Sequence, residues 1–195
     1  MSPGFIPAEE IESAAKAFLL EHHPDGSIPV PIDEIIEIKL KIRIIPIPRL
    51  GSFGIDGFFN HGFTEIHIDE YQFSNSENRA RFTLAHEIGH LVLHKSYVES
   101  QKFKNEEEWK KFIVNDLRRD PLEIQANMFA GFLLLPTKDL EKEYASIKEE
   151  LAKHEEFKDI LPSDSQLAPY IAKPISRIFN VSERCAEIRI NNWLR

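Results

Sequence analysis

The run His86-Glu87-Ile88-Gly89-His90 constrains this 195-residue chain more than any other feature of its sequence. In an α-helix, residues four apart lie on one face, so the two imidazoles of an H-E-x-x-H run can bind a single Zn²⁺. The glutamate between them then lies beside the open coordination position, where it can take a proton from a bound water. The run therefore predicts a helix and, on that helix, metal-assisted hydrolysis of a peptide bond.

The residues around this run favour a helix. Apolar residues recur at helical spacing from Phe82 to Val92, which predicts a helix over about residues 76–95. His86, Glu87 and His90 all fall inside it, and unpaired imidazoles on a buried helix would be costly. This context favours metal ligation over the chance occurrence of a short pattern.

A catalytic zinc needs a third protein ligand, and three histidines are candidates. His94 lies two turns after His86, where the helix carries it away from the pair, so we expect it behind a ligand or at the helix end. His67 alternates with isoleucines on a predicted strand and could face solvent or the cleft. His61 lies in a predicted turn, where we expect it to be exposed.

Glu123 is a better candidate for the third ligand. It lies on a separate predicted helix, and in zincins a carboxylate from a following helix can complete the site. A structural role competes, because Asp120 and Glu123 have the spacing of a capping box at the start of that helix. Spacing alone does not separate the two roles.

Two linked motifs resemble a known family. The segment Arg79–His90, followed by Leu93-His94, resembles the signature of the ImmA/IrrE-type zinc metallopeptidases, which are H-E-x-x-H zincins. The segment Glu123–Pro136, with Gln125, Ala126 and Asn127, is similar to the second motif of that family. The resemblance covers about residues 32–136. It implies a zinc ion held by His86, His90 and Glu123, with Glu87 as the catalytic base.

The same resemblance and the sequence patterns predict an α+β, zincin-like fold. We expect a small antiparallel sheet packed against a helical layer that contains the H-E-x-x-H helix. The strands are predicted at residues 41–47 and within residues 51–69. If Thr64–Ile68 borders the cleft, it could pair with an extended substrate.

We expect a single metallopeptidase domain over residues 1–195, with its core at about 32–136. Residues 96–119 form a charged insertion with one helix near 106–115, which we interpret as a solvated surface helix rather than a lid or docking element. Residues 137–195 are predicted to form C-terminal helices. The first is capped by Thr137 and continues to about Phe157, and two short helices follow at about residues 166–179 and 183–193.

The C-terminal residues 175–189 have the sequence pattern of a helix-turn-helix. Their second helix contains Glu183 and Glu187 as well as Arg184 and Arg189, and a DNA-reading helix should be more basic. The net charge of −8 also argues against neutralising phosphates. We therefore expect this segment to pack on the core, and direct DNA binding is not expected.

Composition favours a cytoplasmic protein. Cys185 is the only cysteine, which excludes an internal disulfide and indicates a reducing compartment. The N-terminus lacks the pattern of a signal peptide, and no apolar run approaches the roughly 18–20 residues of a membrane span. No membrane partner is expected.

The family resemblance implies a zinc-dependent endopeptidase that cleaves a helix-turn-helix transcriptional repressor or antitoxin, in a stress, mobile-element or toxin–antitoxin setting. The alternative is a non-proteolytic, metal-binding regulatory module that acts by binding a repressor or DNA. Stoichiometric silencing of a partner is a third hypothesis.

Overall fold

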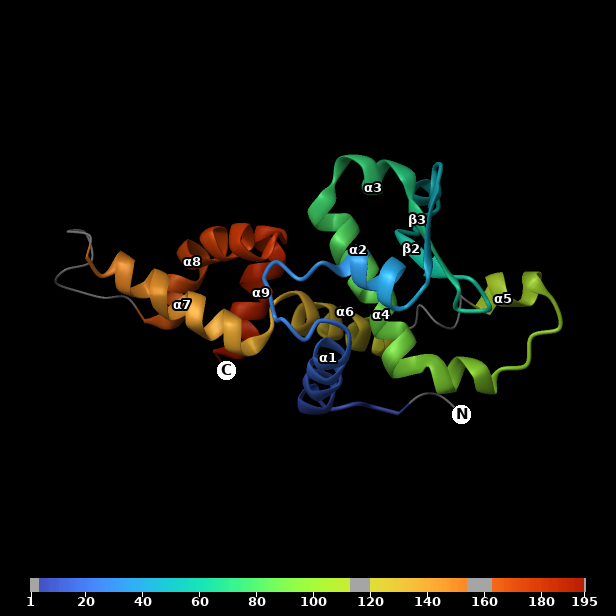
Figure 1. Ribbon diagram of the computed structural model, residues 1–195, viewed down its shortest axis with the longest axis horizontal. Coiled ribbons are helices and arrows are strands. Elements are labelled where there is room, and N and C mark those ends of the chain that lie inside the picture. Colours follow the sequence, from blue (N-terminus) through green and yellow to red (C-terminus); the bar gives the residue numbers. More distant parts are fainter. Residues whose placement is uncertain (1–3, 113–119, 154–162, 195) are drawn as a thin grey trace.

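The computed structural model describes residues 4–112, 120–153 and 163–194, and it places a small sheet beside a layer of helices (Figure 1). The strands are β1 (Arg43–Ile47), β2 (Gly57–Phe59) and β3 (Glu65–Asp69). The helices of the N-terminal half are α1 (Ala8–His22), α2 (Ile32–Glu34) with its π-helical continuation η1 (Ile35–Lys39), the 3-10 helix η2 (Leu50–Phe53), α3 (Glu70–Asn75) and α4 (Glu77–Ser100). The remaining helices are α5 (Glu106–Phe112), α6 (Asp120–Leu134), α7 (Thr137–Leu151), α8 (Asp164–Phe179) and α9 (Glu183–Trp193).

The sheet is mixed, with the strand order β1-β3-β2. β2 and β3 are antiparallel, but β1 and β3 are parallel, because the chain reverses direction twice between them. The predicted α+β class is confirmed, whereas the expectation of a wholly antiparallel sheet is wrong. The hypothesis that Thr64–Ile68 pairs with substrate is also wrong, because β3 is the central strand and has a neighbour on each side.

One face of the sheet packs on the helices. Ile66, Ile68 and Phe59 are buried on that face, while Glu65 and His67 alternate onto the other face and stay partly exposed. The sheet therefore covers α4 with apolar side chains and turns the polar side chains of Glu65 and His67 outward.

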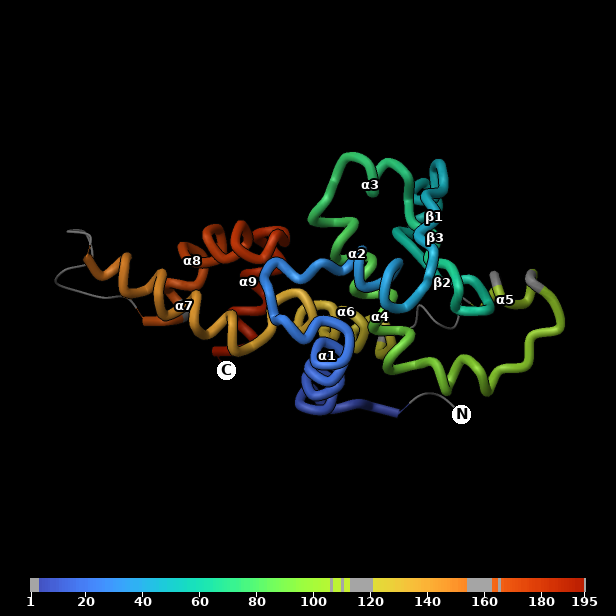
Figure 2. The backbone as a smooth tube through the Cα atoms, viewed as in Figure 1, coloured from blue at the N-terminus to red at the C-terminus, as the bar shows by residue number. Residues whose placement is uncertain are grey.

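α4 and α6 cross in the middle of the molecule (Figure 2). Gly89 lies at the crossing, where an added Cβ would meet the Cα and carbonyl oxygen of Ala126 at 3.1 Å and the Cβ of Phe129 at 3.2 Å. A side chain at position 89 would have to push α6 away. The glycine within the H-E-x-x-H run thus lets α6 approach α4 closely.

α4 is longer than predicted, since it continues to Ser100 instead of ending near Lys95. Its last turns bury Val98 against Trp109 and Phe112 of α5. The expectation of a solvated helix in the insertion is therefore wrong for one face of α5, where Trp109 is only 2% exposed. The predicted end of that helix, at residue 115, lies outside the described residues.

The C-terminal helices pack on the core, as predicted. Ala186 and Ile190 of α9 are buried in the same apolar cluster as residues of α1, α4 and α6. Arg81 of α4 donates to the carbonyl oxygens of Val30 (2.8 Å) and Asn180 (3.0 Å), which joins the N-terminal and C-terminal segments through a buried side chain.

Two boundaries of the C-terminal helices differ from the prediction. Thr137 is the first helical residue of α7 and not its cap, because Pro136 occupies the N-cap position. α8 begins at Asp164, two residues before the predicted start, with a capping box formed by Ser163 and Gln166. The predicted end of α7 near Phe157 lies outside the part that the structure describes.

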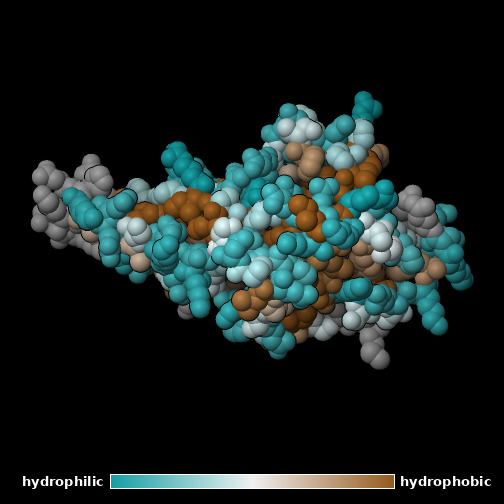
Figure 3. Space-filling view, viewed as in Figure 1, coloured by the Kyte–Doolittle hydropathy of each residue, from teal (hydrophilic) through white to brown (hydrophobic). Residues whose placement is uncertain are grey.

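The face of the molecule shown in Figure 3 is mostly hydrophilic, with apolar patches where α7 meets α8 and beside the sheet. Within the described ranges, no helix is long and apolar enough to cross a membrane.

Candidate metal centre

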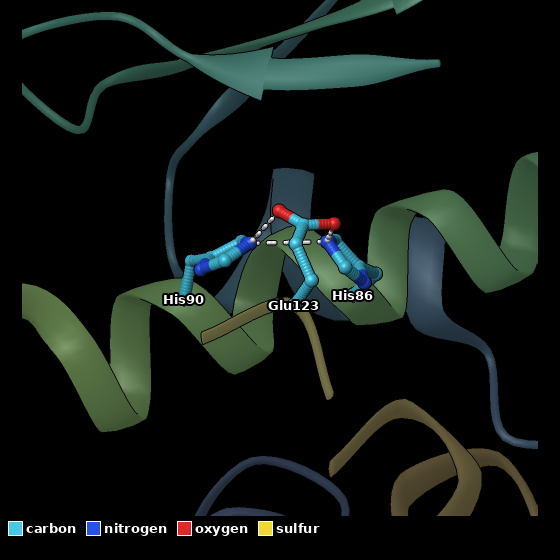
Figure 4. Close-up of side chains that lie close together, drawn as sticks. All are labelled: His86, His90 and Glu123. Atoms are coloured by element: carbon cyan, nitrogen blue, oxygen red, sulfur yellow. Dashed lines mark hydrogen bonds and ion pairs between the residues drawn. The ribbon is translucent and has the colours of Figure 1, made fainter. Parts of the chain in front are cut away.

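α4 and α6 bring together two histidines and a glutamate (Figure 4). The Nε2 atoms of His86 and His90 lie 3.0 Å apart, and each lies 3.4 Å from one carboxylate oxygen of Glu123. The helical spacing of four puts both rings on one face of α4, and the close crossing at Gly89 lets Glu123 reach them from α6. The three residues predicted to bind metal thus converge on one point, which we call the metal point.

This donor set fits a divalent metal ion. Two imidazole nitrogens and one carboxylate are a zinc ligand set that leaves a fourth position open. Bonds of 2.0–2.1 Å in a tetrahedron place ligand atoms about 3.3 Å from one another. The observed separations of 3.0 and 3.4 Å bracket that spacing.

A hydrogen bond orients the His86 ring. Its Nδ1 lies 3.0 Å from the side-chain oxygen of Asn127, one turn after Glu123 on α6. An amide oxygen only accepts, so Nδ1 of His86 carries the proton and Nε2 keeps its lone pair for the metal point.

A second chain of contacts lies behind His90. Its Nδ1 is 2.9 Å from Nδ1 of His94, whose Nε2 is 2.8 Å from the side-chain oxygen of Gln125. All three side chains are buried. His94 therefore lies behind His90 and does not join the group of residues that could hold the metal.

The surroundings of Glu123 and His90 shift their pKa values toward the forms that bind metal. Burial alone would raise the pKa of Glu123, but the imidazole groups of His86 and His90 that face its carboxylate lower that pKa far below its usual range. Burial also lowers the pKa of His90 to about 4. At neutral pH the carboxylate is thus charged and His90 is neutral, which are the metal-binding forms.

His86 behaves differently from His90. Burial works to lower its pKa, but the Glu123 carboxylate that faces its Nε2 and the charge of Glu87 outweigh burial and raise the pKa. In the metal-free protein, His86 is therefore the group at which a proton competes with a metal.

Glu87 is a residue of α4 that lies beside the start of β2, and it is only 4% exposed. An added Cβ on Gly57 would lie 3.7 Å from its Cγ and 2.7 Å from a methyl group of Thr83. Glycine at position 57 thus lets the strand pass close over α4 beside Glu87.

The other histidines lie elsewhere. His67 is on the outward face of the sheet, with its Nε2 3.1 Å from a carboxylate oxygen of Glu65. His61 is exposed in the β2–β3 turn and contacts the rings of Phe103 and Trp109. Gln125 and Asn127 were not assigned roles from the sequence. The available signal was their spacing of two and four residues after Glu123 on an otherwise apolar helix.

The convergence of His86, His90 and Glu123 lies outside two sizeable cavities in the described part of the chain. One, of about 910 Å³, lies between α1, α6 and α9 and reaches Asn127. The other, of about 360 Å³, is lined by residues of the β2–β3 turn and the end of α4. None of His86, His90 and Glu123 lines either cavity.

Comparisons with known proteins agree with this geometry. The Peptidase M78 family model, described as the IrrE N-terminal-like domain, matches residues 39–191 and so includes the triad and Glu87. A solved structure described as a Mycobacterium tuberculosis transcriptional regulator matches with a TM-score of 0.53 and 13% sequence identity, and it shows similarity of fold alone. That match covers 93% of this chain and 46% of the other, so the chain spans about half the length of that protein. No curated protein matches significantly.

Proposed function

This chain belongs to the Peptidase M78 (IrrE N-terminal-like) family, and we propose that it is a zinc-dependent endopeptidase that cleaves a helix-turn-helix transcriptional repressor or antitoxin. The convergence of His86, His90 and Glu123 beside Glu87 is the observation that supports this most directly. In this proposal the first three residues hold the metal and Glu87 is the catalytic base.

The chain's own residues divide the work of the reaction. When bound, zinc would polarise the scissile carbonyl and lower the pKa of a water molecule. The Glu87 carboxylate accepts the proton of the attacking water and delivers it to the leaving amine. Asn127 holds the His86 ring so that its Nε2 faces the metal point.

The position of the site suits a polypeptide substrate. Glu123 keeps 27% of its side chain exposed, so an extended polypeptide can reach the carboxylate from outside. The choice of a repressor or antitoxin rests on the family resemblance. A similar fold in a protein described as a transcriptional regulator is in keeping with it.

The same proposal places the reaction in the cytoplasm, because a chain with one cysteine suits a reducing compartment.

The test uses the purified chain with one equivalent of zinc and its cognate repressor. We expect the intact protein to cut the repressor and Glu87→Gln to bind zinc without cutting. Glu70→Gln, an exposed change on α3, is the matched control and should cut normally. Cutting by Glu87→Gln would refute the assigned base, and silencing of the repressor at equimolar ratio without cleavage would assign a binding role instead.

A further inference from the structure

We infer that His94 and Gln125 are positioning residues that fix the proton of His90 on Nδ1 and so keep its Nε2 available for metal. This inference rests on the proposed metal-binding function. It concerns the buried chain of contacts His90–His94–Gln125, which does not touch the reacting atoms.

The orientation of the Gln125 amide determines which nitrogen of His94 carries the proton. Its Nε2 donates to the carbonyl oxygen of Gly4 at 3.3 Å, so its oxygen faces His94. That oxygen lies 2.8 Å from Nε2 of His94. Because an amide oxygen can only accept, the proton of the His94 ring is on Nε2.

The proton position on His90 follows from this. A neutral His94 with its proton on Nε2 has a lone pair on Nδ1, and that atom lies 2.9 Å from Nδ1 of His90. Only a proton on Nδ1 of His90 makes this contact a hydrogen bond. The Nε2 of His90 is then left with a lone pair, and it points at Glu123 and His86.

Because the three residues of this chain of contacts are buried, one arrangement of the protons on His90 and His94 is strongly favoured. His90, His94 and Gln125 are each at most 4% exposed, so water cannot replace a missing acceptor. The opposite proton arrangement would set two lone pairs against each other at Nδ1, and a buried polar group without a partner is unfavourable. His86 differs, because its partner Asn127 is exposed.

α6 supplies both sides of the His90 ring. Glu123 reaches the Nε2 side, while Gln125 reaches the Nδ1 side through His94. The close approach of α6 to α4 at Gly89 therefore sets the ligand and the positioning residue together.

The first test reads the proton positions directly by ¹⁵N NMR of the histidine rings in the full chain, before and after zinc is added. We expect the proton on Nδ1 of His90 and on Nε2 of His94 in the zinc-loaded protein, and the same two positions in the zinc-free protein. A neutral His90 with its proton on Nε2 in the zinc-free protein would overturn the inference. This measurement needs no variant and no proteolytic activity.

The second test changes the acceptor while keeping its volume. Gln125→Met removes the acceptor, and we expect zinc affinity to fall about 10–100-fold, as for other partners of metal-binding histidines. Gln125→Glu keeps an acceptor oxygen and should retain most of the affinity. Competition with a chelator measures both, and thermal unfolding checks the fold.

The outcomes separate this inference from the proposed function. Unchanged zinc affinity in Gln125→Met, with repressor cleavage intact in the parent protein, would overturn the inference alone. The predicted proton positions and affinity loss in a protein that cuts no repressor would leave the inference standing and refute the proposed substrate.

Discussion

Two partly buried polar networks flank α6, and they differ in which groups lie at the end of each chain of hydrogen bonds. The metal-centre network consists of His86, His90, His94, Glu123, Gln125 and Asn127. The C-terminal network consists of Glu12, Thr137 and Arg189. Both lie between helices, and both link segments that are far apart in the sequence.

The C-terminal network links a cation to a carboxylate through a hydroxyl group. Arg189 donates to the hydroxyl of Thr137 at 2.6 Å, and that hydroxyl donates to Glu12. The guanidinium also lies over the ring of Phe132, 4.6 Å from its centroid, and its buried Nε has no hydrogen-bond partner among the described residues. Positive charge, hydroxyl and carboxylate follow one another, so this network already contains the cation that offsets its carboxylate.

The metal-centre network ends in a surplus of acceptors. Its donors point outward to Asn127 and His94, while two imidazole lone pairs and a carboxylate meet at one point. Such a convergence is unfavourable unless a proton or a cation lies there. The difference teaches that a network whose acceptors converge without a cation marks a candidate cation site, whereas a network that contains its own cation marks structure.

The largest expected effect separates chemistry from binding within the metal centre. Glu87→Gln should lower the cleavage rate about 10²–10⁴-fold, because the reaction loses its base. Zinc content should stay at one per chain, as measured by atomic absorption. Loss of zinc in this variant would mean that Glu87 belongs to the ligand network.

Acid should destabilise the zinc-free protein through His90. Its folded pKa of about 4 lies below the unfolded value of 6.5, so the unfolded chain binds more protons between these values. The free energy of unfolding should fall as pH drops through this window, by at most about 3 kcal/mol.

The pH window also depends on His86 and Glu123. The raised pKa of His86 acts in the opposite direction, because its contribution is present below 6.5 and is lost as pH rises through the folded value. Glu123, whose pKa is lowered, adds to the acid loss. Urea unfolding at several pH values measures the sum, and Arg189→Met should keep the same slope. A stability that rises toward pH 4 would contradict the assignment of a neutral His90.

Gly89→Ala tests the helix crossing that the metal centre requires. The added methyl group meets the backbone of Ala126, so we expect a loss of about 1–3 kcal/mol in unfolding free energy together with weaker zinc binding. Gly131→Ala, where the nearest atom would be 3.8 Å away, is the matched control on α6. Equal zinc affinity in both variants would show that the crossing does not set the site.

Arg189→Met tests the C-terminal network. Methionine keeps much of the volume but removes the charged hydrogen bond and the contact with the Phe132 ring, so stability should fall by about 1–2 kcal/mol. Zinc affinity should not change. A parallel loss of zinc would show that the two networks are coupled and not separate.

The sequence predicts parts of the site that depend on local spacing. His86 and His90 follow from one helical turn, and the start of α4 follows from Ser76 and the apolar period. Glu123 needed the family resemblance, because three residues after Asp120 the same glutamate could cap a helix. The roles of Gln125 and Asn127 depend on how α6 is rotated against α4, which periodicity does not give.

Long-range packing explains the wrong expectations. Alternation in Thr64–Ile68 indicates a strand but not its neighbours, so the central position of β3 was not predictable. The C-terminal end of α4 is mostly polar, so its sequence does not indicate that Val98 is buried. The partner of Val98, Trp109, lies eleven residues later in the chain. A solvated helix was therefore expected where the structure has a packed one.

Calorimetric titration of the zinc-free chain with zinc tests the central claim most directly. The intact protein and Arg189→Met should each bind one zinc ion with equal affinity. Glu123→Gln keeps the shape but removes the charge, and it should lose more affinity than the roughly 10–100-fold typical of a lost hydrogen-bond partner. Equal zinc affinity in Glu123→Gln and the intact protein, or no zinc binding by the intact protein, would contradict the account.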